Sequence, residues 1–249
     1  MVKIRIVPDN PALILEGKKK NLVITDLHIG FESEFGRKKI ILGKNTNILE
    51  IINEVNKIID LENPDSLILL GDVKSSIKNI SNNEWKDVPY FFKNIKNDLE
   101  IIVVPGNHDG NIDKLLPENI SLTTTNGIII ENTLLTHGHA MPKTNFSSIS
   151  KIIMGHVHPI FFNTESVLNG QRIWITMKLA KEKIFPESNG IIEVTIMPSF
   201  NRFFYPTHKK YYKKSISPII HKIDDVISAR ILTLDGTIIG DESTVFNLI

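Results

Sequence analysis

The sequence contains no cysteine among its 249 residues. Disulfide bonds, thiolate ligands and cysteine nucleophiles are therefore excluded, and zinc fingers and iron–sulfur clusters are excluded with them. Any metal ion that this chain binds must be held by oxygen and nitrogen atoms.

Long apolar runs are also missing. No run reaches the roughly 18 apolar residues that a membrane-spanning helix needs, so we expect no membrane association. The first eight residues, Met1 to Pro8, alternate charged and β-branched residues and lack the apolar core and cleavage site of a signal peptide. We therefore expect a cytoplasmic protein.

Neither sign of charge is in large excess. The chain has 29 Lys and Arg against 28 Asp and Glu, for a formal net charge of +1. This balance neither indicates nor excludes nucleic acid or small metabolites as partners, so local charge must be considered instead.

Short runs rich in Val, Ile and Leu recur along the first two thirds of the chain. Such runs, bounded by Gly, Pro, Asn or Asp, are typical of strands buried on both faces. They are Leu22–Ile24, Leu67–Leu70, Ile101–Val104, Ile128–Ile130 and Ile152–Ile153. Between the first two, apolar residues at three- and four-residue steps predict a helix from Thr46 to Asp60. This alternation predicts an α/β architecture.

The last third of the chain predicts strands without a strong helical period. Gln171–Met177 and Gly190–Met197 are candidate strands, and Asp235-Gly236 is a hairpin signal between two further apolar runs. We expect one domain over residues 1–249, with a β-hairpin appendage around residues 228–240.

Five short motifs contain six of the eight histidines. They are Asp26-Leu27-His28, Gly71-Asp72, Gly106-Asn107-His108-Asp109, His137-Gly138-His139 and Gly155-His156-Val157-His158. Each follows a predicted strand, and ligands gather at the carboxyl ends of strands in open α/β sheets, so we expect these residues to meet.

The spacing inside the motifs also carries a prediction. Asp26 and His28 are two residues apart, as are His156 and His158, and a locally extended backbone would point both side chains of a pair the same way. The glycines within and beside the motifs would allow sharp turns and close approach of the backbone.

The ordered motifs resemble those of the calcineurin-like metallophosphoesterase superfamily. The match to Asp26-Leu27-His28-Ile29-Gly30-Phe31-Glu32 and Met197-Pro198-Ser199-Phe200-Asn201 is closest to the ICC-like branch, which includes DNA-ligase-associated phosphoesterases. The resemblance implies a four-layer α-β-β-α sandwich and two divalent metal ions. The implied ligands are Asp26, His28, Asp72 and His158 around one ion, and Asp72, Asn107, His137 and His156 around the other.

The donor set suits Mn²⁺ best, with Fe or Zn²⁺ as alternatives. Two such ions would lower the pKa of a bridging water, and the resulting hydroxide would attack a phosphoester in line. In the family the histidine that matches His108 steadies the transition state or protonates the leaving oxygen. Asp109 could orient that imidazole through a hydrogen bond.

Three further residues are interpreted less directly. His139 could replace His137 as the ligand or could support it, and we favour His137. Lys74 could contact phosphate, or it could be an exposed loop lysine. Arg202 lies in a segment from Val194 to Ile223 that has no acidic residue and interleaves basic with aromatic side chains, a pattern found in nucleic-acid-binding proteins. The alternative is that its aromatic residues complete the core.

The motifs together predict a two-metal phosphodiesterase, with nucleic acid, DNA or RNA, as the expected substrate. The alternatives are a phosphatase or phosphodiesterase that acts on a nucleotide or another small metabolite, and a non-catalytic scaffold that keeps the fold. Because every ligand is retained, the scaffold is the least favoured. The sequence leaves open whether the chain is a monomer or a homodimer.

Overall fold

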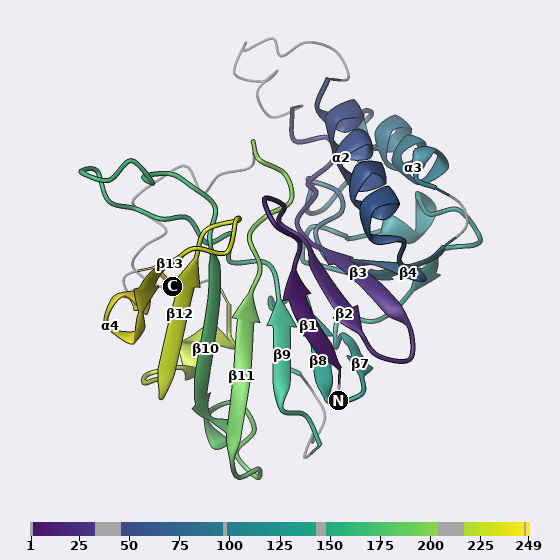
Figure 1. The fold of residues 1–249 in the computed structure, drawn as a ribbon. Coiled ribbons are helices and arrows are strands. Elements are labelled where there is room, and N and C mark those ends of the chain that lie inside the picture. Colours follow the sequence, from purple (N-terminus) through teal and green to yellow (C-terminus); the bar gives the residue numbers. More distant parts are fainter. Residues whose placement is uncertain (1, 33–45, 97–98, 143–147, 204–216, 247) are drawn as a thin grey trace.

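The computed structural model describes the chain except for residues 1, 33–45, 97–98, 143–147, 204–216 and 247. Two β-sheets pack face to face, and two longer helices cover the outer face of the first sheet (Figure 1). The structure confirms the predicted α/β sandwich. Among the described residues, no helix combines the length and the apolar character that a membrane span requires.

The first sheet has the strand order β1-β2-β3-β4-β5-β6. Its strands are β1 (Lys3–Ile6), β2 (Leu13–Glu16), β3 (Lys20–Ile24), β4 (Ser66–Leu70), β5 (Glu100–Val104) and β6 (Ser121–Leu122). The first three pair antiparallel, whereas β3 to β6 pair parallel. The carboxyl ends of β3, β4 and β5 therefore lie along one edge.

The second sheet has the order β13-β12-β10-β11-β9-β8-β7. Its strands are β7 (Ile128–Ile130), β8 (Thr133–Thr136), β9 (Lys151–Met154), β10 (Trp174–Ala180), β11 (Ile191–Ile196), β12 (Ser228–Leu232) and β13 (Ile238–Asp241). Strand β9 runs parallel to both β8 and β11. These three strands thus end at a common edge of the second sheet.

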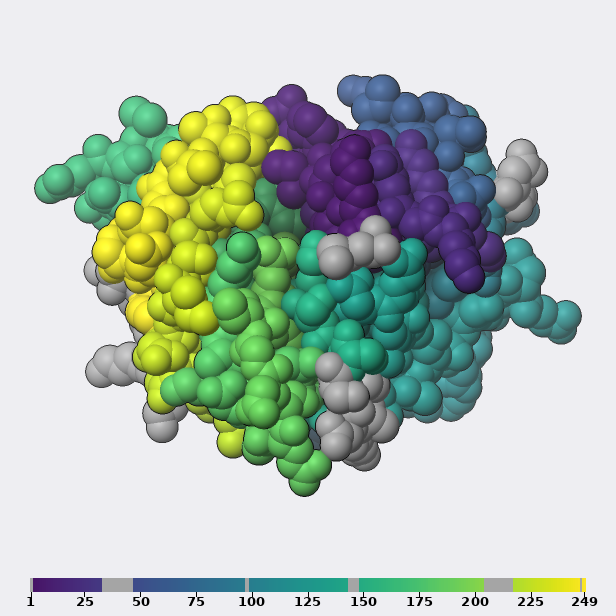
Figure 2. All heavy atoms as spheres, turned by 60° about the horizontal axis from the view of Figure 1, so that its bottom comes forward, coloured from purple at the N-terminus to yellow at the C-terminus, as the bar shows by residue number. Residues whose placement is uncertain are grey.

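Alternating side chains divide the core into layers. In β3, Val23 faces the second sheet, where it belongs to the same buried cluster as Ile153 and Trp174. Its neighbours Leu22 and Ile24 pack on the other face, in the cluster that contains the helices. Figure 2 shows the amino-terminal strands lying directly against the second sheet.

The helices form unequal outer layers. Helices α2 (Thr46–Glu62) and α3 (Glu84–Asn94) cover the first sheet, and η1 (Ile112–Lys114) follows β5. On the outer face of the second sheet, the described residues contribute only the short helices η2 (Lys181–Lys183), η4 (Ile220–Lys222) and α4 (Glu242–Val245). The fourth layer of the sandwich is therefore thin.

Two sequence predictions of elements need correction. His137 follows β8, a strand that the sequence did not predict, whereas the predicted run Ile128–Ile130 is its antiparallel partner β7. The hairpin around residues 228–240 does form, but it is not an appendage: β12 pairs with β10, and β13 is the edge of the second sheet.

Candidate metal centre

The five motifs meet where the two sheets bring their strand ends together. Three of them follow β3, β4 and β5 of the first sheet, and the other two follow β8 and β9 of the second. The structure thus gathers side chains that are up to 132 residues apart in the sequence, from Asp26 to His158.

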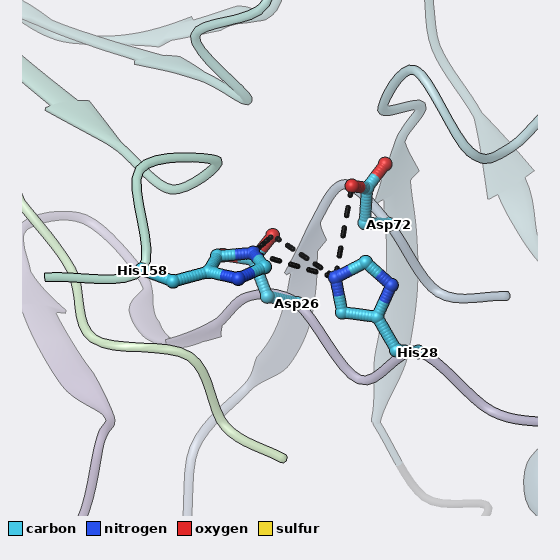
Figure 3. A group of neighbouring side chains, drawn as sticks. All are labelled: Asp26, His28, Asp72 and His158. Carbon is cyan, nitrogen blue, oxygen red and sulfur yellow. Dashed lines mark hydrogen bonds and ion pairs between the residues drawn. The ribbon is translucent and has the colours of Figure 1, made fainter. Parts of the chain in front are cut away.

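One group of candidate ligands consists of Asp26, His28, Asp72 and His158 (Figure 3). The Nε2 atom of His158 lies 3.0 Å from Oδ1 of Asp26 and 3.3 Å from Nε2 of His28. The same His28 nitrogen lies 3.8 Å from Oδ2 of Asp72. Four donor atoms from three loops therefore face one another.

A second group consists of Asp72, His137 and His156, so Asp72 belongs to both groups. The Nε2 atom of His137 lies 3.3 Å from Oδ2 of Asp72. Asn107 comes from the loop after β5, and its buried Oδ1 has no hydrogen-bond partner within the part of the chain that the structure describes.

These distances fit metal coordination. Two ligand atoms that each lie about 2.1 Å from one ion are roughly 3.0–3.4 Å apart in tetrahedral or octahedral geometry. The closest approaches in both groups, 3.0 and 3.3 Å, are within this range. With carboxylate, carboxamide and imidazole donors, the site fits a pair of divalent ions.

Hydrogen bonds to one atom of each carboxylate select the other atom as the ligand. Oδ2 of Asp26 accepts hydrogen bonds from the Thr25 hydroxyl at 2.9 Å and the His156 backbone N–H at 3.1 Å. Oδ1 of Asp72 accepts one from the His108 backbone N–H at 2.8 Å. The remaining oxygens, Oδ1 of Asp26 and Oδ2 of Asp72, face the imidazoles.

The backbone at the ligands is not extended, so the predicted reason for their convergence is wrong. Asp26, His28, Asp72, His156 and His158 all have φ between 44° and 70°, in the left-handed region. Non-glycine residues adopt this region at a cost, and such residues concentrate at functional sites. The side chains of each pair converge through two left-handed residues.

Close backbone approach at the motif glycines is as predicted. A Cβ atom on Gly106 would lie 2.1 Å from Oδ1 of Asp72, and one on Gly155 would lie 2.0 Å from the Thr25 hydroxyl oxygen. Neither contact is sterically allowed. Any side chain at these two positions would displace a carboxylate or the residue that orients it.

A segment after β11 holds the backbone of the first ligand pair. The Ser199 hydroxyl and the Asn201 backbone N–H both donate to the Asp26 carbonyl, at 3.0 and 3.2 Å. The Asn201 side-chain amide donates to the Leu27 carbonyl at 2.9 Å. Both Ser199 and Asn201 are buried. The second sheet thereby supports a ligand loop of the first.

The carboxylates and imidazoles shift one another's pKa values. Burial opposes ionisation of Asp26, but His158 and His137 lower its pKa to about 2. Burial also opposes ionisation of Asp72, but His137, together with His28 and His108, lowers its pKa. Burial alone would lower the pKa of His137, yet Asp72 and Asp26 raise it to about 9. Burial and the nearby His137 lower the pKa of His156 to about 4.

The structure places His137, and not His139, in the ligand groups. Nδ1 of His137 lies 2.9 Å from the Leu70 carbonyl. A carbonyl can only accept a hydrogen bond, so Nδ1 carries the proton and Nε2 is directed at Asp72. The His139 ring stands beside it, with a centroid distance of 5.3 Å.

His108 stands at the rim of the site, where its side chain is 18% exposed. Its Nε2 lies 4.0 Å from Oδ2 of Asp72, and its Nδ1 is bonded to the Ser75 carbonyl. The predicted orienting bond from Asp109 is wrong, because the oxygens of Asp109 accept the backbone N–H groups of Gly106 and Lys74, at 2.8 and 3.1 Å. Burial and the nearby Asp72 raise the pKa of Asp109 to about 6.

The predicted substrate contact by Lys74 is contradicted, and so is the exposed alternative. Lys74 is fully buried, and its Nζ donates to the carbonyls of Ser76 and His108. Arg202, the other predicted contact, is paired with Glu50 at 2.9 Å and with Glu54 at 3.2 Å, both on α2. Residues 204–216, the centre of the predicted basic and aromatic segment, lie outside the described residues.

Several supporting residues were not assigned a role from the sequence. The sequence Ser81-Asn82-Asn83-Glu84 has the form of a capping box, and the Ser81 N–H donates to the Glu84 carboxylate at 2.6 Å while the Glu84 N–H faces the Ser81 hydroxyl at 3.3 Å. That pattern could have located the start of α3. No signal indicated that Glu84 would also hold the Lys74 loop.

Comparisons with known proteins give a family and a fold. A model of the calcineurin-like phosphoesterase family matches residues 20–214. Among solved structures, the chain is similar to the nuclease MPE from Pseudomonas putida, with 16% sequence identity and a TM-score of 0.54 over 94% of this chain and 98% of that chain. The comparison with curated proteins gave no match.

Proposed function

This chain belongs to the calcineurin-like phosphoesterase family, and from that premise we propose that it is a two-metal phosphodiesterase that acts on nucleic acid. Membership of the family makes the chain a metal-dependent hydrolase of phosphoesters. The number of ions, the diester preference and the nucleic-acid substrate are the parts that we propose.

The observation that carries the proposal is the sharing of Asp72 by two groups of ligands. A carboxylate common to two ligand sets is what a pair of ions a few ångströms apart requires. The buried Oδ1 of Asn107 has no hydrogen-bond partner among the described residues, which supports its role as a further ligand. When bound, such ions would lower the pKa of a coordinated water and neutralise charge on the phosphate.

The side chains of the chain itself supply orientation and a proton. The Leu70 carbonyl fixes the ring of His137, and Thr25 fixes the carboxylate of Asp26, so neither ligand must reorganise when an ion binds. Nδ1 of His108 is bonded to the Ser75 carbonyl, and Nε2 lies on the side of the metal centre, 4.0 Å from Oδ2 of Asp72. We propose that the ring enters the reaction with a proton on each nitrogen, that Nε2 gives its proton to the oxygen of the leaving group, and that Nδ1 keeps the other.

A nucleic-acid substrate is favoured by two indications. The structurally similar protein from Pseudomonas putida is a nuclease, and the motifs resemble a branch that includes DNA-ligase-associated phosphoesterases. Arg202 does not add to this argument, because the carboxylates of α2 neutralise it.

The test is a comparison of substrates with the metal-loaded protein. Protein stripped of metal and reloaded with Mn²⁺ is given a diester reporter, the matching monoester, single- and double-stranded DNA, RNA and cyclic nucleotides. We expect the diester to be turned over faster than the monoester, with cleavage of at least one nucleic acid. Turnover confined to monoesters or small nucleotides would favour a phosphatase, and no turnover of any substrate would favour a scaffold.

A further inference from the structure

Lys74 is a fully buried lysine that the chemistry described so far does not use. It follows the shared ligand Asp72 by two residues, and its ammonium group lies beneath the loop that carries His108. Lysine is almost never fully buried unless its charge is paired or hydrogen-bonded. The position therefore calls for a physical explanation.

The ammonium group joins two loops. It donates one hydrogen bond to the Ser76 carbonyl and one, at 2.5 Å, to the His108 carbonyl. The backbone N–H of the same lysine donates to Oδ1 of Asp109 at 3.1 Å. Lys74 thus holds the carbonyl of the peptide bond between His108 and Asp109, and also the side chain of Asp109.

The imidazole of His108 is held by the same loop. Its Nδ1 is bonded to the Ser75 carbonyl, the residue directly after Lys74. Oε1 of Glu84 accepts the backbone N–H groups of Ser75 and Ser76, at 3.0 and 2.6 Å. Because Glu84 is fully buried at the start of α3, this carboxylate anchors the loop to the core.

Nearby carboxylates offset part of the cost of burying the ammonium group. Burial lowers the pKa of Lys74, while the carboxylates of Glu84 and Asp109 oppose that shift. If its hydrogen bonds served only to compensate its own burial, the lysine could be replaced by an apolar side chain of similar volume. Here two of its hydrogen bonds go to backbone atoms that determine where His108 stands.

We propose that Lys74 is a positioning residue that fixes the backbone of His108, so that Nε2 of His108 faces the metal centre. The inference rests on the proposed function, because it assumes that His108 protonates the leaving oxygen. A misplacement of about 1 Å can cost roughly 100-fold in rate, so loss of this contact should be visible in kcat.

The test uses two diesters that differ in their need for a proton. The leaving group of a p-nitrophenyl diester is p-nitrophenolate, an anion that is stable without a proton. The leaving group of a dinucleotide is a sugar alkoxide, which must be protonated. His108→Ala should slow the dinucleotide about 100-fold or more and the nitrophenyl ester much less. Lys74→Met should show the same dependence on the leaving group, with a loss of about 10- to 100-fold for the dinucleotide, mainly in kcat.

A double variant separates positioning from a general effect on the fold. If Lys74 acts through His108, adding Lys74→Met to His108→Ala should cost less than about twofold further, because the two losses are not independent. Lys181→Met is the matched control. Lys181 is also buried but lies in η2 on the second sheet, and its replacement should leave the leaving-group dependence unchanged.

The outcomes are distinct. The role of Lys74 is overturned if Lys74→Met lowers kcat equally for both diesters. It is also overturned if the losses in kcat of the two single variants multiply in the double variant. If His108→Ala itself shows no dependence on the leaving group, the proposed role of His108 fails instead. Bound metal is counted in every variant, and Lys74→Gln, which keeps a donor, is measured beside Lys74→Met. If neither variant retains metal, Lys74 supports the metal centre as a whole and the role specific to His108 is overturned.

Discussion

At the scale of single residues, the ligand atoms of the metal centre are chosen by the hydrogen bonds of their own side chains. Oδ2 of Asp26 accepts hydrogen bonds from the Thr25 hydroxyl and the His156 backbone N–H, and Nδ1 of His137 donates to the Leu70 carbonyl. Each bond leaves one atom directed at the neighbouring ligands. Such supporting bonds fix orientation before an ion arrives and commonly change metal affinity by about 10- to 100-fold.

His137 gives a prediction for pH. Without metal its pKa is about 9, so at neutral pH the ring is protonated and its charge opposes an incoming ion. Metal affinity at this site should therefore rise by up to about tenfold per pH unit between pH 7 and 9, and His137 should release one proton besides any proton lost by a coordinated water. Calorimetry of Mn²⁺ binding in two buffers with different ionisation enthalpies measures the protons released.

The same groups define the contrary result. The pKa of His156 is about 4 and that of His28 is well below its usual range, mainly through burial, so neither should release a proton above pH 7. An affinity that does not change between pH 7 and 9 would contradict the assignment of His137. His137→Gln should reduce the proton release by about one proton per chain, whereas His139→Gln should leave it unchanged.

The sequence could predict which residues form the candidate ligand groups, but it could not predict their geometry. Residue types and order were enough to name Asp26 and His137, because few residue types can bind metal. The left-handed φ values depend on contacts with other loops, such as that from Asn201 to Leu27. The burial of Lys74 depends on how the His108 loop folds over it, which no local pattern encodes.

At the scale of elements, the metal centre depends on a segment that carries no candidate ligand. Residues 199–201 follow β11 and cross to the loop after β3, where they bond the carbonyls of Thr25, Asp26 and Leu27. The strained backbone of a ligand pair persists only where its surroundings over-determine it. This segment supplies that constraint.

Asn201→Ala should weaken metal binding without removing any ligand. The variant leaves the buried Leu27 carbonyl without its partner, which costs about 1–3 kcal/mol in stability, and it loosens the loop between Asp26 and His28. We expect metal affinity at the first ligand group to fall about 10- to 100-fold, as for other supporting bonds, in a titration with Mn²⁺.

Asn21→Ala is the control for that experiment. Asn21 is also buried, and its amide donates to the Lys19 carbonyl at 3.0 Å and accepts from the Ser66 hydroxyl at 2.7 Å, at the opposite end of β3. It should lose similar stability but keep its metal affinity. Equal metal affinity in both variants would refute the supporting role of Asn201.

Elements could be predicted where one face or both faces carry a clear apolar pattern. Helix α2 and the central strands β4 and β5 lie where their runs predicted. Strand β8 was not predicted, because its four residues are two leucines between threonines and the apolar run is too short to indicate a strand. Helix α3 contains Pro89, which removes a backbone donor and interrupts the usual helical signal.

At the scale of the whole molecule, the metal centre joins the two sheets. Asp26, Asp72 and Asn107 come from the first sheet, while His137 and the His156–His158 pair come from the second. Neither sheet holds a complete ligand group by itself, since each group includes residues from both. Bound ions should therefore stabilise the packing of one sheet on the other as well as the site.

The central claim is that hydrolysis needs two ions held by groups that share Asp72. The most direct measurement titrates metal-free protein with Mn²⁺ while following turnover of a diester reporter and the number of ions bound. We predict that turnover reaches its maximum at two ions per chain and that Asp72→Asn, which keeps the size of the side chain, loses both the pairing of ions and the turnover. Full turnover at one ion per chain, or in Asp72→Asn, would contradict the account.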